Sequence, residues 1–340
     1  MSKRKRLAAV TSVDVAAAAG VSQSVVSRAF SRSPGVSAAT RERILQVAAR
    51  LGYRHNQLAR GLITRRSTLL ALVAGALNNP LHLELIQALS RLVQSRGHRV
   101  LLVSAPEGQA IDAAIAEVLP YLPTGIVAMA GTPSLGQVEE CHQMGLPVVI
   151  VGRSAGTTSA SSVSCDNEME ARRVAKALLG AGHRRFAFLS SLQAETSFSA
   201  ERERGFCSTV VQAGCAAPAV VNGGSSYAGG YAAASTLFGT ENAPEAVFCA
   251  GDSIALGLLD AARRDYGLLA PETLSVVGFD DVPMASWASY ELTTVRQRVE
   301  EMATATIDLA LRTTGDDAPL GEIRLVPGDL VVRRSARLVL

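Results

Sequence analysis

The sequence predicts an α/β protein with a small all-α module at its N-terminus and a larger core of two lobes, each a doubly wound parallel sheet. Three observations lead to this prediction. Three short apolar helical patterns follow one another within the first 54 residues. Beyond them, short apolar runs alternate with helical patterns, as they do in parallel sheets covered by helices on both faces. A chain of 340 residues, 48% of them hydrophobic, is long enough for two or three domains with sizeable cores.

The charge of the chain is divided between these parts. The whole chain carries only +3, but residues 1–66 contain 13 Lys and Arg against the two acids Asp14 and Glu42. This segment is therefore +11 and the remainder −8. Such an asymmetry favours a basic module that meets a polyanion, joined to an acidic module with another task. A disordered basic tail is the alternative, which the helical patterning of the segment disfavours.

The helices of the basic module have recognisable starts and stops. Thr11 precedes the first helix, which ends at Gly20, and Ser22 precedes the second. The third begins after Ser37 and ends at Gly52. Two short helices joined by a glycine-containing turn match the helix-turn-helix pattern, whose second helix enters the major groove of DNA. An ordinary three-helix cap with a polar surface is the alternative.

The first turns of the second helix carry side chains suited to reading bases. Gln23 offers an amide, Ser24 a hydroxyl and Arg28, one turn on, a guanidinium. These groups are suitable partners for adenine, for either base type, and for the O6/N7 edge of guanine, respectively. The pattern therefore indicates a sequence-specific DNA interface.

This module resembles the headpiece of the lactose-repressor (LacI/GalR) family of bacterial transcription regulators. The shared segments are Val10-Thr11-Ser12-Val13-Asp14-Val15-Ala16, Ala19-Gly20-Val21-Ser22, Val26-Ser27-Arg28, Val36-Ser37, Thr40-Arg41 and Gly52-Tyr53. The resemblance implies that Gln23, Ser24 and Arg28 occupy the base-reading positions, and we expect Thr11 at the same interface. It also implies a homodimer or tetramer that binds near-palindromic double-stranded operator DNA in the bacterial cytoplasm, associated with the nucleoid.

The expected boundaries are 1–54 for the helix-turn-helix headpiece, 55–66 for a hinge helix and linker, and 67–340 for the core. The hinge has an apolar face made of Leu58, Ala59, Leu62 and Ile63. A helix of about two turns is marginal in water and should form only when it packs against a twin on DNA. The resemblance implies that Asn56, Ala59 and Leu62 contact DNA, with Leu62 as a wedge that enters a base step from the minor groove. A plain linker is the alternative.

The core sequence predicts two lobes with a cleft between them. Candidate strands lie at 69–73, 100–103, 126–129, 148–151, 186–189, 246–249 and 274–278. The resemblance implies a periplasmic-binding-protein-like core whose chain crosses three times between lobes. Lobe 1 would then comprise about 67–166 and 296–326, and lobe 2 about 167–295 and 327–340. Because ligands of open parallel sheets bind beyond the carboxyl ends of the strands, we expect a small-molecule effector between the lobes.

The residues expected to hold the effector come from both lobes. The resemblance places Arg202 and Asp280 at positions that usually hold it, Arg202 as a forked donor and Asp280 as a double acceptor. A solvated surface position is the alternative for each residue taken alone, and for His82 a structural role is equally plausible. The other expected contacts are Leu81, His82, Arg153 and Asp252.

Departures from the family pattern bear on the effector. Gly251 stands where sugar-binding members often have Asn, and Arg153 where some have an acid; Tyr290 replaces a common Pro. If Asp280 is the acid that faces the effector, the two guanidinium groups leave an uncompensated positive charge, which is costly in a closed site. We therefore expect an anionic effector, such as a sugar acid or a phosphorylated sugar. If Arg153 turns outward, a neutral sugar or a purine is expected instead.

Enzymatic chemistry is disfavoured. Gly152-Arg153-Ser154-Ala155-Gly156 fits G-x-S-x-G, but that motif needs a helix after the serine and a later histidine, and no histidine follows His183. Walker, H-E-x-x-H and G-x-G-x-x-G motifs do not occur. The five cysteines are scattered without C-x-x-C spacing, so we expect no metal, no cofactor and no disulfide framework.

A solute-binding protein of the transport class, without DNA function, is the alternative reading of the two lobes. It requires a signal peptide, and the apolar run at 7–10 is too short to serve as one. The run at 69–77 is half the length of a membrane span. This reading would also leave the basic helices without a role. The sequence therefore predicts a ligand-controlled transcriptional regulator, most simply a repressor of an operon for a carbohydrate or related metabolite.

Overall fold

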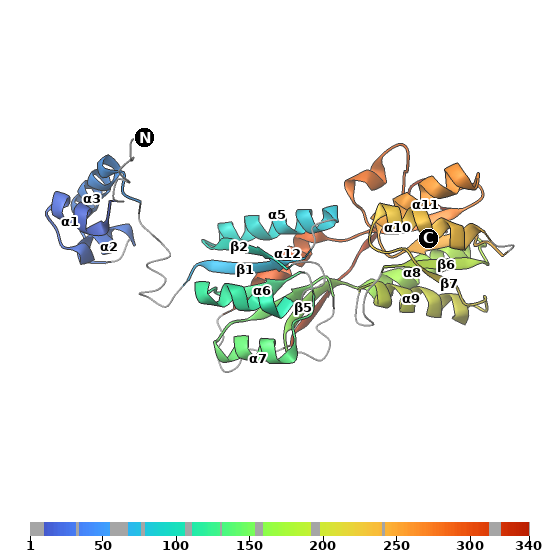
Figure 1. Cartoon of the computed structure of the whole chain (residues 1–340), viewed down its shortest axis with the longest axis horizontal. Coiled ribbons are helices and arrows are strands. Elements are labelled where there is room, and N and C mark those ends of the chain that lie inside the picture. The colour runs from blue at the N-terminus through green and yellow to red at the C-terminus, as the bar shows by residue number, and fades with distance from the viewer. Residues whose placement is uncertain are drawn as a thin grey trace, which may run out of the picture. The chain divides into compact units, whose positions relative to one another are not determined.

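The computed structural model describes residues 10–31, 34–54, 67–75, 79–105, 111–129, 131–153, 159–191, 198–239, 242–312 and 321–339. The chain divides into two compact units, Met1–Arg66 and Ser67–Leu340. The first is all-α and the second contains two six-stranded sheets (Figure 1). The predicted fold class is therefore confirmed.

The first unit is built from α1 (Ser12–Ala19), α2 (Gln23–Phe30) and α3 (Ala38–Leu51). A capping box of Thr11 and Asp14 starts α1, and Gly20, at φ +63°, ends it in a left-handed conformation that glycine adopts without strain. The three helices bury Val15, Val26 and Ile44 completely in one small core. This packing fixes α2 against α1.

The first sheet of the core has the strand order β11-β5-β4-β3-β1-β2, with every neighbouring pair parallel. One apolar cluster joins it to α5 (Pro80–Ser95) and α12 (Val299–Ala310), and another joins its opposite face to α6 (Ile111–Val118) and α7 (Leu135–Gln143). A short 3-10 turn, Leu119–Tyr121, follows α6. The strands are β1 (Leu69–Ala74), β2 (Arg99–Ser104), β3 (Gly125–Ala128), β4 (Val148–Val151), β5 (Ser161–Cys165) and β11 (Ile323–Val326).

The second sheet has the order β12-β10-β9-β8-β6-β7 and is parallel except for β12. Its helices pack in two pairs, α8 on α9 and α10 on α11. They are α8 (Asn167–Gly180), α9 (Phe198–Gln212), α10 (Tyr227–Phe238) and α11 (Asp252–Asp265), with a 3-10 turn at Pro283–Ser286. The strands are β6 (Phe186–Ser190), β7 (Ala219–Asn222), β8 (Ala246–Cys249), β9 (Ser275–Asp280), β10 (Thr293–Arg296) and β12 (Asp329–Val331).

The chain passes between the two sheets three times. It leaves the first sheet after β5, returns to it after β10 and leaves again between β11 and β12. Each lobe is thus assembled from separate stretches of the chain. The carboxyl ends of β4, β6, β8 and β9 lead into the segments that carry the expected cleft residues.

Candidate DNA interface and effector cleft

The predicted base-reading side chains are all exposed on α2. The Gln23 amide Nε2 donates to Ser12 Oγ across 2.9 Å, and the Ser24 and Ser22 hydroxyls lie 2.9 Å apart. Arg28 Nε lies 3.4 Å from the carbonyl oxygen of Ser24, one turn back. These contacts hold the polar side chains close to the helix while leaving them open to solvent.

Thr11, also exposed, is committed to the start of α1. Its backbone N–H and its hydroxyl each donate to Asp14 Oδ2 across 2.8 Å, and these hydrogen bonds lower the pKa of Asp14. The other expected DNA contacts, Asn56, Ala59 and Leu62, lie outside the described residues. So does Ser154 of the G-x-S-x-G segment.

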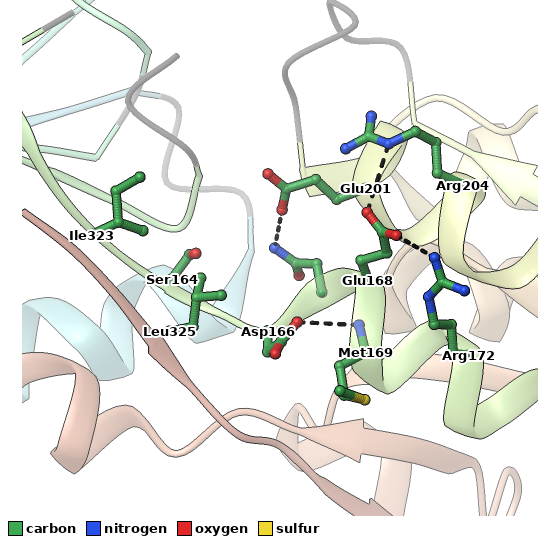
Figure 2. A pocket seen from close by; sticks show the side chains of 10 residues that line it. Ser164, Asp166, Glu168, Met169, Arg172, Glu201, Arg204, Ile323 and Leu325 are labelled. Carbon is green, nitrogen blue, oxygen red and sulfur yellow. Dashed lines mark hydrogen bonds and ion pairs between the residues drawn. The ribbon is translucent and has the colours of Figure 1, made fainter. Parts of the chain in front are cut away.

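A pocket of about 370 Å³ lies where β5 and β11 of the first lobe meet α8 and α9 of the second (Figure 2). One wall of the pocket is charged. There the Glu168 carboxylate pairs with both Arg172 and Arg204. Two of its lining residues, Asn167 and Glu201, are hydrogen-bonded to each other across 2.8 Å. The full lining is Ser164, Asp166, Asn167, Glu168, Met169, Arg172, Glu201, Arg204, Ile323 and Leu325.

Asn167 links this pocket to Arg202. The Nε of Arg202 donates to Asn167 Oδ1 across 2.9 Å, and its Nη1 donates to the carbonyl oxygen of Ala250. The guanidinium carbon lies 3.4 Å from the centre of the Phe279 ring, a cation–π contact. Only 3% of Arg202 is exposed, and burial lowers its pKa, whereas the negative charge of Asp280 raises it. The charge is thus enclosed by partners.

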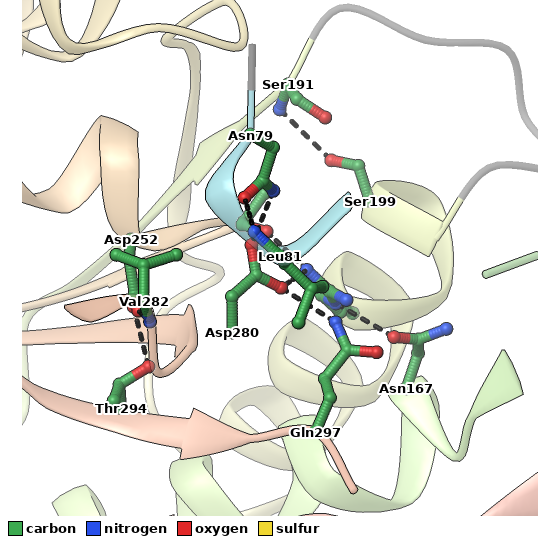
Figure 3. A network of polar contacts seen from close by, with 12 residues as sticks. Asn79, Leu81, Asn167, Ser191, Ser199, Asp252, Asp280, Val282, Thr294 and Gln297 are labelled. Atoms are coloured by element: carbon green, nitrogen blue, oxygen red, sulfur yellow. Dashed lines mark hydrogen bonds and ion pairs between the residues drawn. The ribbon is translucent and has the colours of Figure 1, made fainter. Parts of the chain in front are cut away.

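Asp280 is the centre of the polar network shown in Figure 3. Its Oδ2 accepts from the Asn79 amide across 2.8 Å and its Oδ1 from the Gln297 amide across 2.7 Å; Arg202 Nη1 lies 3.9 Å away. Asn79 caps α5 in the first lobe, whereas Asp280 ends β9 in the second. The residue has φ +124°, a strained conformation for a side chain larger than glycine, of the kind that functional sites retain.

Asp252 lies behind Asp280 and is completely buried. Both of its oxygens are already used: Thr294 donates its hydroxyl to Oδ1 across 2.6 Å, and the Val282 N–H donates to Oδ2 across 2.9 Å. A Cβ on Gly278 would lie 2.1 Å from Oδ1, so glycine is required beside this carboxylate. Burial, and next the charge of Asp280, raise the pKa of Asp252 to about 7. Asp252 thus holds Val282, two residues after Asp280, and its contact with the effector stays a prediction.

The first-lobe wall contains Leu81, His82 and Arg153. The Leu81 N–H donates to Asn79 Oδ1 across 3.0 Å, and Leu81 and His82 are partly buried in the first turn of α5. Arg153, directly after β4, is partly buried, and burial lowers its pKa while the charge of Glu201 raises it. Glu201 acts on Arg153 only through its charge, and no ion pair joins Arg153 to any described residue.

Further polar residues of the network were also missed. Asn79 was visible only as a helix start, and Gln297 and Asn167 carry no signal in a single sequence. Ser191, at the end of β6, has a buried hydroxyl oxygen without a hydrogen-bond partner in the described part of the chain, while its N–H donates to Ser199 Oγ across 3.1 Å. A buried hydroxyl without a partner at a strand end is available to a ligand.

The described ranges contain no group of three or more His, Cys, Asp and Glu that could hold a metal ion. All five cysteines are free. Within the same ranges, no helix is both long and apolar enough to cross a membrane.

Comparison with known proteins identifies both units. Residues 11–56 match the family described as bacterial regulatory proteins, lacI family, and residues 175–336 match the periplasmic binding protein-like domain. The HTH-type transcriptional regulator MalR of Streptomyces coelicolor is 33% identical over 336 residues, which cover 95% of each chain. The ribose operon repressor of Haemophilus influenzae is 26% identical over 305 residues, 89% of this chain and 91% of its own.

The fold of the whole chain is also found in a solved structure. The crystal structure of the lac repressor dimer bound to operator and the anti-inducer ONPF superimposes with a TM-score of 0.87 at 24% identity, covering 96% of this chain and 99% of its own. The similar proteins are regulators and not enzymes, in agreement with the sequence prediction. Likeness above 30% identity along nearly the whole length shows the family: the chain belongs to the LacI family of bacterial regulatory proteins and is a DNA-binding transcriptional regulator.

Proposed function

We propose that this regulator is a repressor of an operon for the use of a carbohydrate or a related small metabolite, and that an effector bound between its lobes sets its affinity for the operator. The observation that carries the proposal is Asp280, a strained carboxylate at the end of β9 in the second lobe, which accepts hydrogen bonds from Asn79 of the first lobe and from Gln297, just after β10. A ligand that competes for this carboxylate changes what holds the lobes together. The name of the Haemophilus relative, a ribose operon repressor, supports both the repressor role and the ligand class.

The DNA half of the proposal rests on α2. Gln23, Ser24 and Arg28 read base edges in the major groove, and Thr11 lies at the edge of the same interface. One headpiece reads one half-site, so a homodimer reads a near-palindrome; the lac repressor structure with the same fold is such a dimer on its operator. Asn56, Ala59 and Leu62 of the hinge complete the contacts at the centre of the site. The protein acts at the nucleoid in the bacterial cytoplasm.

The effector half rests on the charges of the cleft. The case for an anionic effector assumed that Asp280 faces two arginines alone. Arg202 has Asp280 at 3.9 Å, whereas Glu201 raises the pKa of Arg153 without forming a close ion pair with it, so the charge of Arg153 is only partly offset. The first candidate is a neutral ligand rich in hydroxyl groups, which donates to Asp280 and accepts from Arg202 and Arg153, with Leu81 and His82 as its first-lobe wall. Asp252 supports the site through Val282, two residues after Asp280, whose N–H donates to it.

A sugar acid or a phosphorylated sugar is the second candidate. Arg153 favours it, because its guanidinium makes no hydrogen bond or close ion pair with any described residue. An anionic ligand group that accepts hydrogen bonds from the Arg153 guanidinium would replace Glu201 as its counter-charge. The two candidates differ in one group only and can be compared as matched pairs.

The test uses the full chain and an operator selected from random DNA. Sugars and their corresponding sugar acids are titrated calorimetrically, and the same ligands are added to operator complexes in a mobility-shift assay. We expect a neutral sugar to bind more tightly than its acid and to change operator affinity. Tighter binding of the acid, with a loss in Arg153→Ala, would establish the second candidate. Operator affinity that no ligand of either class changes would refute the effector proposal. Mass measurement in solution distinguishes a dimer from a tetramer.

A further inference from the structure

One hydrogen bond joins the beginnings of the first two helices of the headpiece. Gln23 and Ser12 are 11 residues apart in the chain, and Gln23 Nε2 lies 2.9 Å from Ser12 Oγ. Gln23 is exposed and Ser12 is partly buried. We propose that Ser12 is a positioning residue for sequence specificity, which orients the Gln23 amide to read adenine. This inference rests on the proposed function, in which Gln23 reads a base.

The hydroxyl of Ser12 is available for this task because the start of α1 is capped by other residues. Thr11 and Asp14 form the capping box, in which the Thr11 N–H and hydroxyl donate to Asp14 and Thr11 Oγ1 faces the Asp14 N–H. Ser12 is the first residue inside the helix, and its oxygen takes no part in this box. Its contact is with α2 and not with its own helix.

The frame that carries the two side chains is rigid. Ala16 and Val26 belong to the buried core of the headpiece, and the turn between α1 and α2 passes through Gly20. The two backbones are therefore held by packing, without help from the hydrogen bond. What the hydrogen bond adds is an orientation for the Gln23 side chain, which would otherwise sample several rotamers and both amide orientations.

The orientation of the amide decides which base edge it matches. A glutamine amide has two N–H groups and one carbonyl oxygen. With one N–H given to Ser12, one N–H and the carbonyl oxygen remain, which suit N7 and the N6 amino group of adenine. The flipped amide would give its carbonyl to the Ser12 hydroxyl and would present two donors, which suit the acceptors O6 and N7 of guanine. In the structure Ser12 accepts from Nε2, and this hydrogen bond leaves the amide set for adenine.

The experiment measures base preference with the full-length protein. The native chain first selects its operator from a random library, and competition assays then compare all four base pairs at each position of a half-site. Gln23→Ala identifies the position that Gln23 reads. Ser12→Ala removes the acceptor, and Ser12→Thr keeps it. Ser31→Ala is the matched control, because the Ser31 hydroxyl donates only within its own helix, to the Ser27 carbonyl.

We expect Ser12→Ala to lower the preference for A·T at the Gln23 position about two- to tenfold, the effect of losing the order of one long side chain. Ser12→Thr and Ser31→Ala should keep the native preference. Ser12→Ala should not change the affinity for non-specific DNA or the salt dependence of that affinity, because the phosphate contacts are intact. The melting temperature should also stay the same, because the core is intact.

Three results would overturn the inference. An equal loss of affinity on every operator variant would show that Ser12 contacts the DNA backbone and not that it orients Gln23. An unchanged preference in Ser12→Ala, or a preference that Gln23→Ala does not alter, would show that the hydrogen bond does not serve reading. A native protein that selects no sequence at all would refute the proposed DNA function itself, a failure distinct from these three.

Discussion

Asn79 and Asp280 belong to different lobes and are joined by a hydrogen bond of 2.8 Å from the Asn79 amide to the carboxylate. Asn79 also caps α5 by accepting from the Leu81 N–H, so the same side chain ties a helix start to the opposite lobe. A ligand hydroxyl that takes the place of the Asn79 amide would therefore act on α5 and on Asp280 together. This arrangement gives a direct route from ligand binding to lobe position.

Asp280→Asn should uncouple the regulator from its effector. Asparagine tolerates the positive φ but accepts with only one oxygen and leaves Arg202 without its buried counter-charge. We expect effector affinity to fall about 10- to 100-fold and the free energy of unfolding by about 1–3 kcal/mol. Effector-free operator binding should persist. Calorimetry and denaturant melts check this, with exposed Glu272→Gln as the control; an effector response equal to that of the native chain would contradict the role of Asp280.

Asp252→Asn should remove one component of the pH dependence of stability. Burial and the charge of Asp280 raise the pKa of Asp252 to about 7, above its ordinary value of 3.8. Between about pH 4 and 7 the folded state therefore binds more protons than the unfolded one, and this carboxyl makes stability fall as the pH rises through that window. Asparagine imitates the protonated form, with its amide facing Thr294 and its oxygen facing the Val282 N–H.

The measurement for Asp252 is denaturant unfolding of both proteins between pH 4 and 8. The free energy of unfolding of the native chain, relative to the variant, should fall steadily from pH 4 to 7 and then level off. A difference that stays constant with pH would show that Asp252 titrates in the folded protein as it does in the unfolded one.

Arg28→Ala should cost about 1–3 kcal/mol at the selected operator and relax the preference at one base pair in each half-site. Arg28 is exposed, and its Nε contacts only the Ser24 carbonyl oxygen one turn back, so its removal should leave the headpiece folded. Competition assays with base-pair variants provide the measurement. A loss of the same size on every sequence would identify Arg28 as a phosphate contact.

Leu62→Ala should abolish most of the specific affinity and keep the weak non-specific affinity, because the latter depends on the arginines. The prediction comes from the sequence alone, since Leu62 lies outside the described residues. Footprinting on the selected operator gives the test. A variant that protects this operator as tightly as the native chain would show that Leu62 is not a wedge.

The sequence predicted best the elements that have a clear apolar pattern within their own residues. The runs at 69–73 and 246–249 correspond to β1 and β8, which are almost entirely buried, so their composition is set by burial on both faces. β5 was not recognised, because Ser161–Cys165 contains three serines that face neighbours and not solvent. Its strand character comes from pairing with β4 and β11, a tertiary effect that no local pattern records.

The sequence could predict those cleft residues that come at or after the ends of strands. Arg202 and Asp280 follow strands, and the structure brings them to 3.9 Å. The influence of the Glu201 charge on Arg153 and the hydrogen bond from Gln297 to Asp280 depend on how the chain crosses between lobes. Tyr290, noted only as a departure from the family pattern, donates its hydroxyl to Asp260 on α11 and so steadies the segment that follows Asp280. Such long-range partners are outside the reach of one sequence.

The triple passage of the chain between the lobes has a genetic consequence. A stop codon shortly after β10 would leave the second lobe nearly complete but would delete α12 and β11 from the first. Val127 and Val149 would then be exposed where Met302 and Ile307 now cover the sheet. Late nonsense mutations should therefore yield protein that is degraded or insoluble, never a shortened regulator that still responds to its effector. Gene fusions that divide the core should not fold, for the same reason. Fusions joined before Ser67 should fold, because the second compact unit begins there.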